Sequence, residues 1–136
     1  MKILFTRFPL ESAFGGAEVQ TLTLMEGLIS RGHSVAFAGS CPECKKRNIM
    51  VVEWPVGAPP VTKWGVISFT WKQAAMKRKL ALLLDQFHDL DAIAMLSLTE
   101  KLLLTDVAAK KGIKTLWIEH DTVGRWLTHN PWLAQL

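Results

Sequence analysis

Residues 14–18 read Phe14-Gly15-Gly16-Ala17-Glu18, and this stretch decides how the rest of the chain is interpreted. An apolar run at residues 3–5 comes before it, and residues 19–29, which are apolar at helical spacing, come after it. A buried strand, a glycine turn and an amphipathic helix in this order are the start of a βα unit.

The glycine pair has two interpretations, and both stay open on the sequence alone. The first amides of a helix have no partner within it and lie at the positive end of its dipole, so Gly15 and Gly16 would let a phosphate approach them closely. Alternatively, the two glycines only allow a tight turn from strand to helix.

Composition predicts one globular domain spanning residues 1–136, with 49% hydrophobic and 21% charged residues. The longest aliphatic run, residues 80–84, is too short to cross a membrane. Arg7 and Pro9 interrupt the apolar start before it could serve as a signal peptide, so we expect a cytoplasmic protein. The net charge of +4, with basic clusters at residues 45–47 and 77–79, favours an anionic partner, though not a nucleic acid.

The only two cysteines form the sequence Cys41-Pro42-Glu43-Cys44. A zinc site would need a second pair of ligands at suitable spacing, which the chain does not supply. A thioredoxin-type redox pair would follow the first strand and open a helix, whereas Pro42, Glu43 and the basic residues after Cys44 suggest an exposed loop. We therefore favour two loop thiols, and we expect neither a metal nor a cofactor.

Taken in order, the chain alternates strands and helices. We predict strands at residues 2–8, 33–38, 49–53, 92–96 and 113–119. We predict helices at residues 17–31, at residues 71–87 after a capping box that starts at Thr70, and from a second capping box, Ser97 to Glu100, up to Gly112. Residues 122–136 are interpreted as a loop and the start of another helix.

This alternation predicts an α/β fold, a Rossmann-like parallel sheet with helices on both faces. Ligands of such sheets bind at the carboxyl ends of the strands. Four features fall there: Arg7 with the glycine turn, the segment after Ala38, Ser97, and the pair His120-Asp121. NAD is disfavoured because no G-x-G-x-x-G follows the first strand and no carboxylate ends the second, and no P-loop sequence is present.

Several stretches together resemble the amino-terminal half of a GT-B fold glycosyltransferase, of the retaining type grouped as family four. They are Lys2-Ile3-Leu4-Phe5, the Phe14–Glu18 stretch, Leu28-Ile29-Ser30-Arg31-Gly32-His33-Ser34-Val35, Asp91-Ala92-Ile93 and Trp117-Ile118-Glu119-His120-Asp121. In that family many members have a histidine after the fourth strand, where this chain has Met95-Leu96-Ser97, and this difference concerns the acceptor.

The resemblance implies transfer of a hexose from a nucleotide diphosphate sugar to a carbohydrate or lipid-linked acceptor hydroxyl, with retention and without a metal. It places Gly15 and Gly16 at the donor diphosphate, and His120 beside the sugar and the acceptor. Arg7, Ser97 and Asp121 are weaker candidates for acceptor or substrate binding. It also implies a second, carboxy-terminal domain, so that residues 1–136 are a truncated acceptor-side domain, inactive alone.

Alternatives remain for these residues and for the whole chain. His120 is otherwise a strand-end histidine, Asp121 a turn residue, Arg7 a surface arginine and Glu18 a first-turn helix carboxylate that interacts with the dipole. The chain is otherwise a natural half-enzyme that binds a separate catalytic subunit, or a non-enzymatic α/β domain that binds a small ligand or a partner.

The predicted helix at residues 71–87 also combines features of a helix that lies on a membrane surface. Tryptophans and basic residues adjoin it, and it has an apolar stripe formed by Met76, Leu80, Leu83 and Phe87. An ordinary amphipathic helix packed on the sheet is favoured over this peripheral membrane contact.

Overall fold

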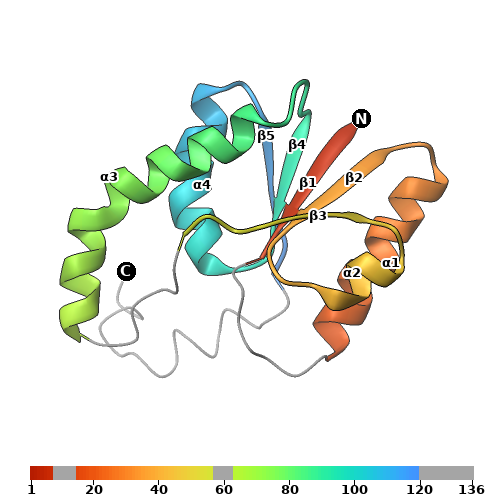
Figure 1. The fold of residues 1–136 in the computed structure, drawn as a ribbon, viewed down its shortest axis with the longest axis horizontal. Coiled ribbons are helices and arrows are strands. Elements are labelled where there is room, and N and C mark those ends of the chain that lie inside the picture. The colour runs from red at the N-terminus through yellow and green to blue at the C-terminus, as the bar shows by residue number, and fades with distance from the viewer. Residues whose placement is uncertain (8–14, 57–62, 120–136) are drawn as a thin grey trace, which may run out of the picture.

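The computed structural model describes residues 1–7, 15–56 and 63–119 (Figure 1). Within them the strands and helices alternate as predicted. Their order is β1 (Lys2–Thr6), α1 (Gly16–Ser30), β2 (Ser34–Ala38), α2 (Pro42–Lys46), β3 (Met50–Val52), α3 (Lys63–Asp85), β4 (Ala92–Met95), α4 (Leu98–Lys110) and β5 (Lys114–Trp117).

The five strands form one parallel sheet in the order β3-β2-β1-β4-β5. From β1 the chain first builds outward through β2 to β3, and then returns to the other side of β1 to add β4 and β5. The connection to β4 therefore reverses the direction of growth, and ligands of open α/β sheets bind outside the carboxyl ends of the strands at such a point.

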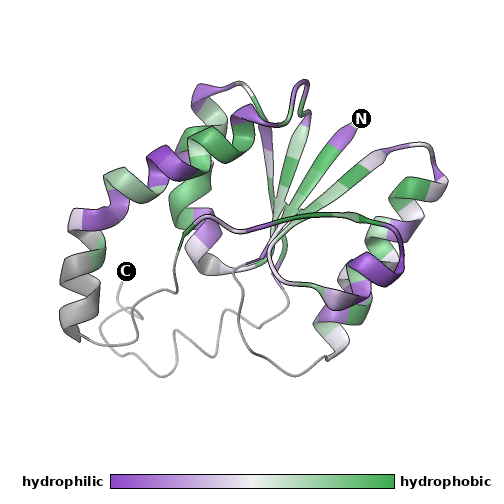
Figure 2. Ribbon diagram, viewed as in Figure 1, coloured by the Kyte–Doolittle hydropathy of each residue, from purple (hydrophilic) through white to green (hydrophobic). Residues whose placement is uncertain are grey.

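Helices cover both faces of the sheet, with α1 and α2 on one side and α3 and α4 on the other (Figure 1). Successive side chains of a strand point to opposite faces. In β1, accordingly, Leu4 packs with the α3 and α4 residues, while Phe5 packs with Leu22 and Met25 of α1. Hydrophobic residues run along the central strands, whereas the helices alternate between hydrophobic and hydrophilic residues (Figure 2). The predicted Rossmann-like α/β fold is confirmed.

Two helices differ from the predictions. Residues 42–46, expected in an exposed loop, form α2, because Pro42 occupies the first helical position and the Cys41 sulfur accepts the backbone N–H of Cys44. The helix α3 begins at Lys63 instead of Trp71. Residues 63–70 contain glycine and β-branched residues, which form helices poorly by themselves, and Phe69 of this extension packs against the core.

The apolar stripe of α3 belongs to the core. Leu80 and Leu83 are buried, and Met76 and Phe87 pack against the same cluster, so the favoured prediction of an ordinary packed helix is confirmed. Trp71 lies outside this contact and is 84% exposed. Across the described residues, every helix is too short or too polar to span a lipid bilayer.

The first and last predicted strands are shorter than expected. β1 ends at Thr6 and β5 at Trp117, although one further ladder hydrogen bond continues each of them. Residues 8, 120 and 121 and the predicted helix start within residues 122–136 lie outside the described residues.

Candidate functional site

The ends of four strands lie side by side at the carboxyl edge of the sheet. Thr6 pairs with Ala38 on one side and with Met95 on the other, and Met95 pairs in turn with Trp117. The ladder then runs one residue further. Its additional bonds are from Arg7 N to Ala38 O (3.1 Å), from Leu96 N to Thr6 O (3.1 Å) and from Ile118 N to Met95 O (3.0 Å). The segments that follow β1, β2, β4 and β5 therefore start from one edge.

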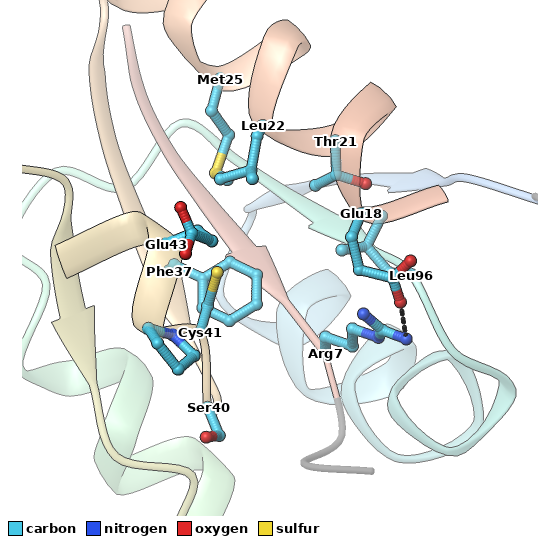
Figure 3. A pocket seen from close by; sticks show the side chains of 11 residues that line it. Arg7, Glu18, Thr21, Leu22, Met25, Phe37, Ser40, Cys41, Glu43 and Leu96 are labelled. Carbon is cyan, nitrogen blue, oxygen red and sulfur yellow. Dashed lines mark ion pairs between the residues drawn. The ribbon is translucent and has the colours of Figure 1, made fainter. Parts of the chain in front are cut away.

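A pocket of about 280 Å³ opens at this edge, between α1 and the ends of β1 and β2 (Figure 3). Its apolar wall consists of Leu22, Met25, Phe37 and Leu96, and its polar groups come from Arg7, Glu18, Thr21, Ser40 and Glu43. An apolar cavity with a few convergent polar groups is the usual form of a small-molecule site. Sequence analysis placed Arg7 here but assigned no ligand role to Ser40 or Glu43, whose only signal was their position just after β2.

Arg7 and Glu18, which both line the pocket, form an ion pair at one side of it (Figure 3). Glu18 also accepts the backbone N–H of Gly15 through Oε2 at 2.9 Å, so this carboxylate in the first turn caps the start of α1. Burial disfavours the ionised carboxylate, but hydrogen bonds from the amides of Glu18 and Gly15, together with Arg7, outweigh this effect and lower the pKa of Glu18. Glu18 is thus the first-turn carboxylate that the alternative interpretation described, and Arg7 already has an anionic partner.

Gly16 opens α1 with free space in front of it. A Cβ added to this residue would meet no atom within 4 Å, and Gly15 has a φ of −130°, which other residues adopt as well. Packing therefore does not demand a glycine at position 16, and its φ is not in the left-handed region. Gly16 is exposed at the start of this 15-residue helix, where the first amides have no partner within the helix.

Gly39, in contrast, is required by the fold. Its φ is +144°, and an added Cβ would lie 2.4 Å from the carbonyl oxygen of Arg7. This close approach of two backbones brings the chain after β2 against the end of β1, and it sets Ser40 and Cys41 into the pocket wall. Sequence analysis treated Gly39 only as a small residue after a strand.

The start of α4 is tied to the segment after β5. Ser97 directly precedes the helix, as predicted, but its side chain makes no capping bond to the helix backbone, and its hydroxyl donates to Oε1 of Glu100 at 3.1 Å. Lys101, whose side chain is 1% exposed, donates from Nζ to the carbonyl of Ile118 at 3.0 Å and to Glu119 at 2.5 Å. A buried ammonium therefore holds the residues next to His120. Nothing in the sequence marks Lys101 as a functional residue, because a lysine in an amphipathic helix carries no signal of burial.

The structure describes some of the predicted site residues and not others. Arg7, the turn at Gly15 and Gly16, and Ser97 follow strand ends or open helices at the carboxyl edge, whereas His120 and Asp121 lie outside the described residues. Among the residues that the structure describes, no group of three histidine, cysteine, aspartate or glutamate side chains is arranged to hold a metal ion.

Comparisons with known proteins support the fold. No protein-family model matches the sequence, and no curated protein matches it either. Among solved structures, the chain is similar to the glycotransferase of kitacinnamycin, with a TM-score of 0.63. It is also similar to MurG of Acinetobacter baumannii, with a TM-score of 0.62, and both proteins are 17% identical to it. The matches cover 98% and 94% of this chain but only 37% and 38% of those chains.

A third similar structure is the carboxy-terminal domain of a hydrogenase from Pyrococcus furiosus, with a TM-score of 0.58 and 17% identity. That match covers 86% of this chain and 90% of the hydrogenase domain. These structural similarities show a shared α/β fold. At such low sequence identity they show nothing more, because one fold can carry different chemistry in different families. The chain thus shares its fold with domains of two glycosyltransferases and of a hydrogenase, and its function must be argued from the site.

Proposed function

We propose that this chain is the acceptor-side domain of a glycosyltransferase that transfers a hexose from a nucleotide diphosphate sugar to an acceptor hydroxyl, with retention, as the family-four resemblance implies. A second α/β domain would complete the donor site. The fact that the chain spans less than two fifths of two glycosyltransferases of similar fold supports this division. The domain alone is then inactive and binds the donor weakly.

The observation that carries the proposal is the open start of α1 beside a pocket at the carboxyl edge. A Cβ added to Gly16 would meet no atom within 4 Å, so there is space beside the end of the helix where unpaired N–H groups and the dipole would stabilise a diphosphate. A leaving diphosphate gains negative charge in the transition state, so fixed donors at this place would accelerate the reaction. The Gly15 amide already binds Glu18, and donor binding would therefore rely on the amides that follow it.

The remaining residues have roles on the acceptor side. The pocket has the size of a monosaccharide site, and its carboxylates and hydroxyls, from Glu18, Glu43 and Ser40, suit the hydroxyl groups of a sugar. His120 would lie beside the sugar and acceptor, where its imidazole can donate a hydrogen bond or orient the acceptor hydroxyl. Ser97 and Asp121 would line the acceptor path, and no metal takes part.

Binding of a nucleoside diphosphate tests the donor site in the isolated domain. Gly16→Ala adds a methyl group in front of the helix start without a clash inside the protein, so the variant should fold normally and lose at least about threefold in affinity. Gly27→Ala, in the same helix but away from its start, is the matched control. Titration calorimetry or ligand-observed NMR measures both. Equal affinities for all three proteins would argue against the glycine turn as the phosphate site.

Catalysis is tested in the full-length protein. His120→Ala should lower kcat by about a hundredfold, the usual effect of removing a group that moves or orients a proton. The domain of residues 1–136 should show no transfer from any nucleotide diphosphate sugar. Measurable turnover by this domain would contradict the two-domain assignment, and an unchanged kcat of His120→Ala would contradict the role of the histidine.

A lipid-linked acceptor would bring the domain to a membrane surface, on the cytoplasmic side if the predicted location holds. The outer face of α3 supports this, since Trp71, Lys72, Arg78 and Lys79 are all exposed. Sedimentation with liposomes, with and without anionic lipid, should show binding only to the anionic ones. Identical behaviour with both lipids would dispose of the membrane contact.

The second candidate is an α/β domain that binds a small ligand or a partner without transferring a sugar. The similarity to a hydrogenase domain, of which 90% is covered, favours it specifically. In that case no nucleotide sugar should raise the thermal unfolding temperature of the domain. A half-enzyme that binds a separate catalytic subunit would show transfer only after that subunit is added.

A further inference from the structure

The two cysteines lie together at the start of α2, next to the pocket. The Sγ atoms of Cys41 and Cys44 are 2.8 Å apart, and Cys44 donates from its thiol to the Cys41 sulfur. The backbone N–H of Cys44 donates to the same sulfur at 3.3 Å. Both thiols are reduced in this structure.

The surroundings of the two sulfur atoms differ. Cys41 is partly exposed and lines the pocket, whereas Cys44 is fully buried in the cluster that contains Met25, Phe37 and Ile49. Burial raises the pKa of the Cys44 thiol far above its ordinary value. The Cys41 sulfur, in contrast, is reached from the pocket, and it accepts two hydrogen bonds, from the backbone N–H and the thiol of Cys44. One cysteine is therefore suited to attack and the other to remain a thiol until its neighbour has reacted.

We propose that Cys41 and Cys44 form a reversible dithiol-disulfide site, in which Cys41 is the attacking thiol and Cys44 the resolving one. The oxidant is a small-molecule disulfide such as oxidised glutathione. The Cys41 thiolate attacks one sulfur of this disulfide, which forms a mixed disulfide and releases one glutathione thiolate. Cys44 then loses its proton and attacks Sγ of Cys41, which releases the second glutathione. The protein loses two electrons and two protons, and the disulfide gains them as two thiols.

Other uses of a C-x-x-C pair have less support in this structure. Among the described residues no third ligand stands with the two cysteines to form a metal site. Their place in the fold also differs from the exposed loop that sequence analysis favoured, because Cys41 precedes a helix and Cys44 is part of the core.

Oxidation would change the pocket directly. A disulfide bond is about 2.05 Å long, so the two sulfur atoms must approach one another from 2.8 Å, which moves the Sγ of a residue that lines the pocket. The neighbouring Glu43, between the two cysteines, is another lining residue. The proposal does not depend on sugar transfer, and it holds equally for a domain that binds another ligand.

The test uses residues 1–136, which contain only these two cysteines. The folded protein is incubated with oxidised glutathione, denatured in acid, treated with an alkylating reagent and weighed by mass spectrometry. We expect the mass to fall by two hydrogen atoms, with neither cysteine alkylated. A product that carries glutathione on both cysteines, a disulfide-linked dimer, or an unchanged dithiol would each overturn the proposal.

Two single variants separate the roles of the cysteines. Cys44→Ser should stop at a stable mixed disulfide on Cys41. In Cys41→Ser, the buried Cys44 should react with oxidised glutathione at least about tenfold more slowly than Cys41 does in Cys44→Ser, because a buried thiol is inert. Far-UV circular dichroism confirms that both variants are folded. Equal reaction rates of the two variants would contradict the assignment, and the wild-type mass decides the proposal even if one variant does not fold.

Discussion

Lys101 and Glu119 form an ion pair in which only the lysine is buried. We predict that removing the carboxylate and removing the ammonium have unequal effects on stability. The Lys101 side chain is 1% exposed and the Glu119 side chain is 51% exposed. Removing the carboxylate leaves an ammonium in the protein interior, whereas removing the ammonium leaves a carboxylate that water reaches. We therefore expect Glu119→Gln to destabilise the protein more than Lys101→Met does.

The expected magnitudes follow from these exposures. Glu119→Gln keeps the shape of the side chain, so Nζ of Lys101 stays shielded and keeps its bond to the neutral carbonyl of Ile118, but it loses the charge of the carboxylate. The cost should be roughly 3 kcal/mol, the lower end for breaking a buried pair, because half of the pair is solvated. Lys101→Met keeps the apolar volume and loses two hydrogen bonds, at about 1 to 2 kcal/mol, while the carboxylate becomes hydrated.

Urea unfolding at neutral pH, followed by far-UV circular dichroism, measures the free energy of unfolding of each variant. The double variant, Lys101→Met with Glu119→Gln, should resemble Lys101→Met, because no charge is then left in the interior. If Lys101→Met proves the more destabilising of the two single variants, the reasoning from burial is refuted. A double variant as unstable as the sum of both would refute it as well.

The remaining predictions concern the candidate site. Gly39→Ala should destabilise the domain by roughly 3 kcal/mol or more, because it combines a left-handed backbone with a Cβ placed 2.4 Å from the Arg7 carbonyl oxygen. Gly16→Ala is the matched control for urea unfolding, and we expect a change of less than about 1 kcal/mol, towards higher stability. Glu18→Gln should cost about 1 to 2 kcal/mol at neutral pH through the weakened pair with Arg7 and the weakened cap on Gly15. Because folding lowers the pKa of Glu18 from 4.5, its contribution is present above that pH and is lost as the pH falls through the folded pKa. The unfolding free energies of wild type and Glu18→Gln should therefore converge in acid, and a constant difference would contradict this origin.

The charges around the pocket bear on which part of the proposed substrate would bind there. Glu18 and Glu43 bring two carboxylates to the cavity, and Arg7 and Lys46 pair with them. A cavity with this balance is suited to neutral hydroxyl groups more than to a diphosphate. Under the proposed function, the pocket would therefore take the sugar or the acceptor, and the donor phosphates would bind at the start of α1.

The sequence by itself determined the fold class and most of the elements. Apolar runs such as residues 3–5 and 92–96 predict buried parallel strands, because both of their faces must be covered, and the pattern at residues 19–29 predicts the helix between them. These signals are local, since the period of the apolar residues and the capping residues lie within one element. The start of α3 was missed for the same reason, because long-range packing of residues such as Phe69 outweighs a weak helical propensity.

Only the tertiary structure decided what surrounds each polar group. Nothing in the sequence separates Lys101, which is buried against the end of β5, from the exposed lysines of the same chain. Likewise, the spacing of Cys41 and Cys44 does not reveal that one sulfur faces a pocket and the other the core. Burial and electrostatic partners depend on residues far apart in sequence, which the strand order β3-β2-β1-β4-β5 brings together, whereas the pattern that builds each strand acts within a few residues.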